Sequence, residues 1–228
     1  MRLHICLNNR ENKMTQFISF LQLKGGAGKS TLSANLCGFL LEQGHKVLAL
    51  DSDMPQGTLA AWASMYEHPK FKCLTAADPQ QLSTILKHAN GHFDFVVIDS
   101  PPRLAEMMTA ILYVSDLVLL PMAATSPDIW AVSDMAGIIN KTLKAQDKKV
   151  KIRVVWNKYK DTKKIQETRE DALSIFGYKE IPVPISNFIA YAEVMGMGRH
   201  ALDYNHAKAK SQFTDFGNAV LTALNEKD

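Results

Sequence analysis

A short apolar run, a glycine-rich turn and the start of a helical pattern follow one another directly in residues 17–31, FISFLQLKGGAGKST. Gly25, Gly26 and Gly28 allow a tight turn whose backbone N–H groups point inward. A helix that begins near Lys29 adds the positive end of its dipole at the same place. The segment therefore predicts a phosphate site at the carboxyl end of a strand, and the alternative, a glycine turn without a ligand, leaves that order of elements unexplained.

The rest of the chain alternates short apolar runs with longer helical patterns. The runs do not alternate apolar with polar residues, which is typical of parallel strands covered on both faces. We therefore expect an α/β fold: a doubly wound, mostly parallel sheet with helices on both faces and ligand at the carboxyl ends of the strands. The expected strands cover residues 17–21, 47–50, 95–98, 117–120, 152–156 and 181–185, and the expected helices cover residues 30–43, 58–66, 79–88, 103–114, 127–145, 164–176 and 211–225.

Length and composition favour one cytoplasmic domain. A chain of 228 residues with 46% hydrophobic residues is long enough to bury one full core. Its longest apolar stretch is interrupted by Glu106 and Asp116, which excludes a membrane span. Three cysteines in no CxxC pair indicate neither a zinc site nor a disulfide framework. We expect the polar residues 1–13, which precede Met14, to be a flexible arm or a non-native extension, and residues 14–228 to form a single domain.

The glycine-rich loop departs from the common phosphate-loop pattern GxxxxGK[ST]. That pattern needs glycine at position 23, where this chain has Leu23 followed by Lys24. KGGAGKS instead matches the deviant Walker A form KGGxGK[ST], and here the sequence resembles the ParA/MinD family of P-loop ATPases, closest to the small ParA-type partition ATPases. The resemblance implies ATP and Mg²⁺, with Lys29 on the β- and γ-phosphates and the Ser30 hydroxyl on the metal. The implied nucleotide contacts are Gly25, Gly26, Ala27, Gly28, Lys29, Ser30 and Thr31.

Two carboxylates end the next apolar strand, in VLALDSDMPQG at residues 47–57. The segment resembles the D-x-D-P-Q switch of the family, with Met54 inserted after Asp53. By this resemblance Asp51 lies near the metal through water, and Asp53 orients the attacking water in line with the γ-phosphorus. An ordinary pair of aspartates at a strand-to-turn junction is the alternative.

A third apolar strand, in FDFVVIDSPP, ends at Asp99. It fits a Walker B strand, because parallel neighbours bring their carboxyl ends to one edge of the sheet. A carboxylate there can hold the hydration shell of Mg²⁺ opposite Ser30. The expected metal residues are therefore Ser30, Asp51 and Asp99.

Lys24 precedes the glycines and is not needed to hold phosphates that Lys29 already contacts. In the family this signature lysine reaches across a two-fold interface to the partner's nucleotide, so the resemblance implies a homodimer that forms around two ATP molecules. A solvated loop lysine is the alternative. The catalytic residues implied are Lys24, Lys29 and Asp53.

Two later segments offer candidates for contact with the adenine. Asn157 follows a strand in VVWNKYKD, where the family often has an asparagine at the adenine edge. Pro184, in IPVPIS, resembles the loop on the other side of the base. Either residue could equally serve the geometry of a turn.

Positive charge is concentrated between residues 141 and 164, where ten basic residues stand against two aspartates. Such a stretch is expected for contact with a phosphate backbone, and a solvated helix end is the alternative. ParA-like proteins bind DNA without sequence preference as ATP dimers, so the resemblance implies nonspecific DNA binding. The expected DNA contacts are Lys148, Lys149, Lys151, Arg199, Lys208 and Lys210.

The last helical pattern, at residues 211–225, is followed by a lone cation, Lys227, and so predicts a packing helix rather than a basic membrane anchor. We therefore expect a nucleoid-associated ParA-type ATPase. It would drive plasmid or chromosome segregation with a ParB-like centromere-binding adaptor and without a membrane. The alternatives are a MinD-like or conjugation-associated positioning ATPase and, on the same scaffold, a metabolic phosphotransferase or ligase.

Overall fold

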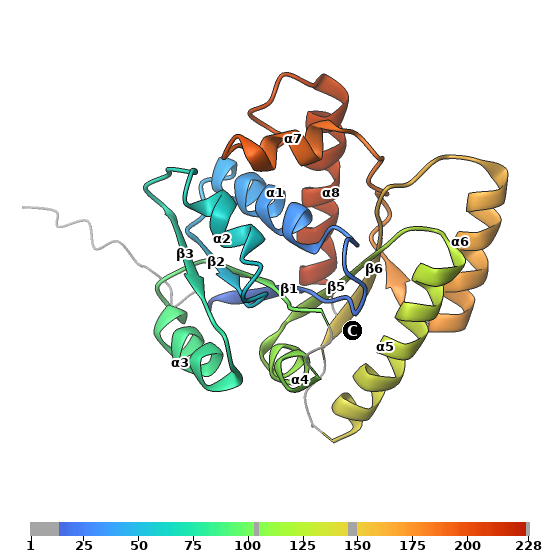
Figure 1. The fold of residues 1–228 in the computed structure, drawn as a ribbon, viewed down its shortest axis with the longest axis horizontal. Coiled ribbons are helices and arrows are strands. Elements are labelled where there is room, and N and C mark those ends of the chain that lie inside the picture. The colour runs from blue at the N-terminus through green and yellow to red at the C-terminus, as the bar shows by residue number, and fades with distance from the viewer. Residues whose placement is uncertain (1–13, 103–104, 146–149, 227–228) are drawn as a thin grey trace, which may run out of the picture.

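The computed structural model describes residues 14–102, 105–145 and 150–226. It contains a seven-stranded sheet in the order β3-β2-β4-β1-β5-β6-β7, in which every neighbouring pair is parallel (Figure 1). The strands are β1 (Gln16–Phe20), β2 (Val47–Asp51), β3 (Phe71–Thr75), β4 (Phe95–Asp99), β5 (Leu117–Met122), β6 (Lys151–Trp156) and β7 (Lys179–Glu180). The helices are α1 (Lys29–Glu42), α2 (Thr58–Ala63), α3 (Pro79–Ala89), α4 (Ala105–Val114), α5 (Ser126–Lys144), α6 (Lys163–Phe176), α7 (Ala190–Gly196) and α8 (Ala207–Asn225).

Helices cover both faces of the sheet, so the predicted doubly wound α/β fold is confirmed (Figure 1). One hydrophobic core joins α1, α2, α7 and α8 to one face, and a second joins α3, α4, α5 and α6 to the other. Along β4, Val97 belongs to the first core, whereas Val96 and Ile98 belong to the second. Because successive side chains of a strand point to opposite faces, a strand between two cores is apolar at every position.

The order of strands reverses at β1, which lies between β4 and β5. Phe20 at the end of β1 is paired with Asp99 at the end of β4, and Asp51 at the end of β2 is also paired with Asp99. The loops after β1, β2 and β4 therefore leave the sheet at one edge. In doubly wound sheets, ligands bind at the point where the strand order reverses.

The last expected strand is wrong in position. β7 covers Lys179–Glu180, and residues 181–185 continue beside β6 without strand geometry. Pro182 and Pro184 have no N–H to donate, so a regular ladder cannot continue through them.

Two elements, β3 and α7, are absent from the sequence-based expectations. β3 is an edge strand with no fully buried side chain, and it therefore lacks the continuous apolar run of the inner strands. α8 also begins earlier than expected, at Ala207, where the His206 side chain accepts a hydrogen bond from the Ala209 N–H. Residues 1–13 and the expected helix start at Arg103 lie outside the described residues. No helix within the described ranges is both long and apolar enough to cross a bilayer.

Candidate functional site

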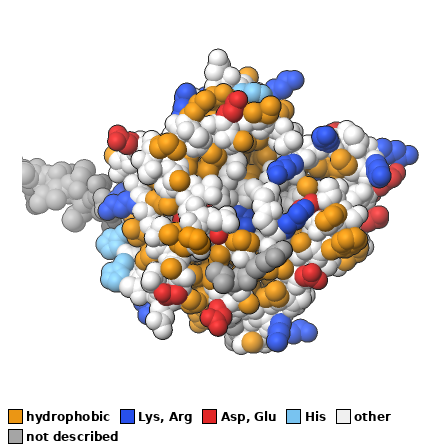
Figure 2. Space-filling view, viewed as in Figure 1, with side chains coloured by type: hydrophobic (Ala, Val, Ile, Leu, Met, Phe, Trp, Pro, Cys, Tyr) orange, Lys and Arg blue, Asp and Glu red, His pale blue; other side chains and the backbone are white. Residues whose placement is uncertain are grey.

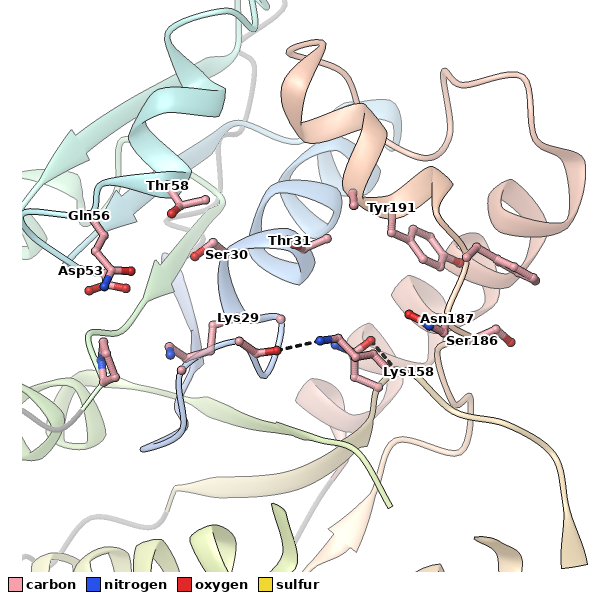
Figure 3. A pocket seen from close by; sticks show the side chains of 17 residues that line it. Lys29, Ser30, Thr31, Asp53, Gln56, Thr58, Lys158, Ser186, Asn187 and Tyr191 are labelled. Carbon is pink, nitrogen blue, oxygen red and sulfur yellow. Dashed lines mark hydrogen bonds between the residues drawn. The ribbon is translucent and has the colours of Figure 1, made fainter. Parts of the chain in front are cut away.

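A cavity of about 420 Å³ opens at the carboxyl edge of the sheet, beside the glycine-rich loop (Figure 3). Its lining comes from the loop after β1, the first turn of α1, the segment from the loop after β2 to the start of α2, Pro102 after β4, the segment after β6 and residues 186–192. Figure 3 shows the start of α1 in the middle of the view, with Asp53, Gln56 and Thr58 on one side and Lys158, Ser186, Asn187 and Tyr191 on the other.

The glycine-rich loop has a backbone that requires glycine. Gly26 and Gly28 have φ angles of 74° and 96°, in the left-handed region. A Cβ atom at Gly28 would lie 2.2 Å from Nδ2 of Asn157, so that position also has no room for a side chain. Gly28 caps α1 without any side-chain hydrogen bond, and the first turn of α1 carries no acidic residue. The N-terminal N–H groups of α1 are therefore available to an anion in the cavity.

Lys29, Asp53 and Asp99 form a charged group below this loop. Burial lowers the pKa of Lys29, and the carboxylates of Asp99 and Asp53 oppose that shift. Burial raises the pKa of Asp99 to about 7, with the nearby Ser30 hydroxyl as the strongest opposing influence. Both carboxylate oxygens of Asp99 are buried and have no hydrogen bond of regular geometry within the described part of the chain. Carboxylate oxygens without hydrogen bonds, together with a nearby hydroxyl oxygen, are ligands that suit Mg²⁺. Ser30 and Asp99 therefore fit the predicted metal.

Asp51, the last residue of β2, and Asp53, in the loop that follows, have different surroundings. Asp51 is fully buried, and its carboxylate accepts hydrogen bonds from the N–H groups of Asp53 at 2.9 Å and Ala60 at 2.8 Å. Asp53 lines the cavity, and burial raises its pKa while Lys29 opposes the shift. Asp51 thus holds the loop that carries Asp53, and its water-mediated contact to a metal stays a prediction.

Asn157 contacts the glycine-rich loop with its amide. Its Nδ2 donates to the Ala27 carbonyl at 2.8 Å, and its Oδ1 accepts from the Lys158 N–H at 2.9 Å. Asn157 also lines the cavity, which is compatible with a contact to the adenine edge. That contact stays a prediction. Pro184 lines a neighbouring cavity, and residues 186–188 line the cavity beside the glycine-rich loop in its place.

Several lining residues are absent from the sequence-based candidates. Lys158 directly follows Asn157 at the end of an expected strand, and that position alone could have identified it. Asn187 and Tyr191 carry no local signal, because their place depends on how residues 181–196 return to the sheet edge.

Lys24 points away from the cavity of its own chain. Its Nζ lies 3.0 Å from Oδ2 of Asp128, and its side chain is 42% exposed. Asp128 itself is buried and also accepts a hydrogen bond from the Thr125 hydroxyl. Trp130, which is 66% exposed, lines the same shallow hollow as Lys24. A role for Lys24 at a second nucleotide is compatible with this position and stays a prediction.

Three of the expected DNA contacts lie near α8, at opposite ends of the helix. Lys151 Nζ donates to the Leu224 carbonyl at the end of α8, at 2.6 Å, and is partly buried. Lys208 and Lys210 are exposed in the first turn of α8. At 1.5 Å per residue, the two ends of α8 are separated by roughly 20 Å or more. A DNA contact by Lys151 on the same face as Lys208 and Lys210 stays a prediction, although the Lys151 ammonium already donates to a carbonyl at the far end of α8.

The remaining basic residues are placed as follows. Arg199 is exposed and pairs with Asp203, the Nε–Oδ1 distance being 3.4 Å. Lys148 and Lys149 lie outside the described residues. Figure 2 shows Lys and Arg side chains scattered over the viewed face and interspersed with Asp and Glu.

Comparisons with known proteins agree with this architecture. The family model described as the CobQ/CobB/MinD/ParA nucleotide binding domain matches residues 18–196. The chain is 27% identical over 212 residues to the maintenance of carboxysome distribution protein A of Halothiobacillus neapolitanus, covering 90% of this chain and 95% of that protein. It is 28% identical over 213 residues to protein ParA of Rhizobium radiobacter, covering 89% of this chain and 95% of that protein.

A solved structure has the same fold. The septum site-determining protein MinD from Pyrococcus horikoshii, in complex with Mg-ADP, superposes with a TM-score of 0.76 at 22% identity, covering 94% of this chain and 100% of that one. The family model spans most of the chain, including the glycine-rich loop and the ends of β2 and β4. The chain therefore belongs to the family of CobQ/CobB/MinD/ParA nucleotide-binding domains, as its deviant Walker A loop predicts.

Proposed function

We propose that this chain is an Mg²⁺-dependent ATPase of the ParA/MinD type that hydrolyses ATP to ADP and phosphate. One observation carries the proposal: the glycine-rich loop, Lys29, Ser30 and Asp53 line one cavity, and Asp99 lies within reach of Ser30 and Lys29. The structure of MinD in complex with Mg-ADP shows that this fold can bind a nucleotide together with Mg²⁺.

The chain's own groups supply binding and orientation in this proposal. N–H groups of the loop and of the first turn of α1 hold the phosphates, and the Lys29 ammonium lies against the β- and γ-phosphate oxygens. Ser30 and Asp99 hold Mg²⁺, which when bound neutralises charge that develops on those oxygens. The Asp53 carboxylate accepts a hydrogen bond from the attacking water and so orients it. Asp51 keeps Asp53 in place, and Asp51 also contacts the metal through a water molecule in this proposal.

We place the adenine at the opposite end of the cavity, where Asn157, Ser186, Asn187 and Tyr191 lie. The amide of Asn187 offers both a donor and an acceptor at this end, and Tyr191 offers an aromatic ring. Pro184 is left out of this subsite because it lines the neighbouring cavity.

The ATP-bound state in this proposal is a homodimer. Two features support it: Lys24 is directed away from its own cavity, and the large apolar side chain of Trp130 is exposed beside it. Lys24 would leave Asp128 and contact the nucleotide of the second copy. Monomer would then prevail with ADP or without nucleotide.

The proposed cargo system is of the partition type. The dimer binds DNA nonspecifically through Arg199, Lys208 and Lys210, and a ParB-like adaptor that binds a centromere site connects it to a plasmid or chromosome. The likeness to protein ParA supports an ATPase of this type. The carboxysome-distribution relative supports a second candidate, a positioning ATPase whose cargo is a protein assembly.

Three measurements test these proposals. ATP hydrolysis should require Mg²⁺ and stop with EDTA. Molar mass measured by light scattering should double with a slowly hydrolysed ATP analogue, and the Lys24→Ala protein should stay monomeric.

ATP hydrolysis by the protein alone should be slow, and it should rise with duplex DNA plus an adaptor. A response to a small metabolite and to neither DNA nor adaptor would favour a metabolic phosphotransferase or ligase instead.

A further inference from the structure

Lys158 holds a backbone conformation that lysine disfavours. Its φ angle is 55°, and it is the one residue other than glycine with a positive φ among those the structure describes. This left-handed region is crowded for any residue with a Cβ atom. The Lys158 N–H donates to Oδ1 of Asn157 at 2.9 Å, which helps to fix the strained turn. A strained residue beside a ligand cavity suggests that its side chain is needed there.

The Lys158 side chain reaches the glycine-rich loop. Its Nζ donates to the Gly26 carbonyl at 2.9 Å, as the dashed line in Figure 3 shows, and Nδ2 of Asn157 donates to the next carbonyl, that of Ala27, at 2.8 Å. In a trans peptide the carbonyl and the following N–H point in opposite directions. By holding two consecutive carbonyls, the segment after β6 sets the direction of the N–H groups of Ala27 and Gly28.

The same side chain forms part of the cavity wall. Lys158 lies between the phosphate end of the cavity, at Lys29 and Ser30, and the end formed by Asn187 and Tyr191 (Figure 3). A lysine can place its methylene stem against a flat apolar group while its ammonium binds elsewhere. The stem is therefore in position to contact a purine ring whose phosphates lie in the glycine-rich loop.

We propose that Lys158 is a positioning residue that couples the two ends of the nucleotide site. Its ammonium sets the geometry of the glycine-rich loop, and its stem supports the base. This inference rests on the proposed function, because it assumes that a nucleotide occupies the cavity. Lys158 lies outside the deviant Walker A loop, and the proposal makes phosphate binding depend on it as well.

Two variants separate the two parts of the side chain. Lys158→Met keeps a stem of similar length and removes the ammonium. Lys158→Gly removes both parts and is suited to a φ of 55°. The probes are Mg-ADP, which has a base, and tripolyphosphate, which has none, each titrated by calorimetry. Lys160→Met, an exposed lysine two residues further along, is the matched control.

The expected results differ between the probes. Lys158→Met should weaken both probes by about tenfold, the size expected for one lost hydrogen bond from a charged donor. Lys158→Gly should weaken Mg-ADP by a further factor of about three to ten and tripolyphosphate no further. In steady-state assays Lys158→Met should raise the KM for ATP with little change in kcat, because binding is lost equally in ground and transition states. Lys158→Arg should restore much of the affinity.

Thermal unfolding distinguishes positioning from a merely structural role. Lys158→Gly relieves backbone strain, but glycine also gives the unfolded chain more conformational freedom, which opposes that gain. The variant should therefore unfold close to the wild-type temperature while binding Mg-ADP less tightly. Unchanged affinity of Lys158→Met for both probes would overturn the role of Lys158. So would a loss of affinity in either variant that only parallels a loss of stability. Wild-type protein that binds neither probe would instead overturn the proposed function.

Discussion

The glycine-rich loop at residues 24–31 and the basic stretch at residues 141–164 are the two densest signals in the sequence, yet the structure keeps only the first of them together. Apart from Lys24 and Ala27, every residue of the loop lines one cavity. The basic stretch instead includes all of β6. Lys151 lies at the amino end of this strand, and Lys158 lies beyond its carboxyl end. A strand of six residues is about 20 Å long, so neighbours in sequence can belong to opposite ends of a molecule.

The largest effect that this comparison predicts comes from Lys29. Lys29→Ala removes the buried ammonium below the glycine-rich loop, and we expect ATP affinity to fall by at least about 100-fold, as for a lost charge-assisted contact to phosphate. Calorimetric titration with Mg-ATP measures it. Lys164→Ala, which removes an exposed lysine of the basic stretch, is the control and should bind ATP as wild type does. Equal affinities of the two variants would contradict the assignment of the cavity.

The next effect is the pH dependence of stability due to Asp99. Burial raises its pKa from 3.8 to about 7 in the folded chain. The folded state therefore holds a proton more tightly than the unfolded state, so this contribution to stability is complete below pH 4 and is lost as the pH rises towards and through 7.

Asp99→Asn removes this pH-dependent loss. We expect a free energy of unfolding at pH 8 that is higher than that of wild type by about 2 kcal/mol, and a smaller difference at pH 5. Urea unfolding in EDTA without nucleotide measures both. Asp134→Asn, at an exposed position of α5, should follow the wild-type curve. A variant less stable than wild type at pH 8 would show that another group satisfies the Asp99 carboxylate.

DNA binding should depend on the start of α8 rather than on the start of β6. Neutralising Lys208 and Lys210 together, both to Gln, should lower the affinity of the ATP-bound protein for duplex DNA by about tenfold. The slope of log affinity against log salt should flatten by roughly 1.8 per chain, or roughly 3.6 for the ATP-bound dimer, since each phosphate contact contributes about 0.9. Fluorescence anisotropy across a salt series gives both values. If neutralising Lys148 and Lys149 flattened the slope and the α8 pair did not, the binding face would lie beyond α5.

The smallest effect should come from Lys151, and it should concern stability. Lys151→Met removes the hydrogen bond to the Leu224 carbonyl, and we expect the free energy of unfolding to fall by about 1 kcal/mol. Urea unfolding measures the change, with Lys160→Met as an exposed control. Affinity for DNA should stay at the wild-type value. A loss of DNA affinity without a loss of stability would return Lys151 to the binding surface.

The sequence predicts well those features that depend on neighbouring residues or on a pattern that recurs from strand to strand. The inner strands are apolar at every position because cores lie on both of their faces, and the glycine-rich loop contains its own turn. β3 is missed because an edge strand with partly exposed side chains has no such run. The contact between Lys158 and Gly26 joins residues 132 positions apart, and no spacing along the chain encodes it. Asp51 illustrates the same limit, since its backbone partners appear only once the loop to Ala60 is folded.

The two edge strands of the sheet differ in length. β7 has two residues and is followed by Pro182 and Pro184, so this edge offers few N–H groups to a further strand. β3, the other edge strand, has five residues, among them Leu74, which is 45% exposed. A longer edge strand offers more backbone N–H and C=O groups for pairing with a strand of another molecule. If copies of this chain ever join sheet to sheet, in a filament or an aggregate, the growth would have to start at β3.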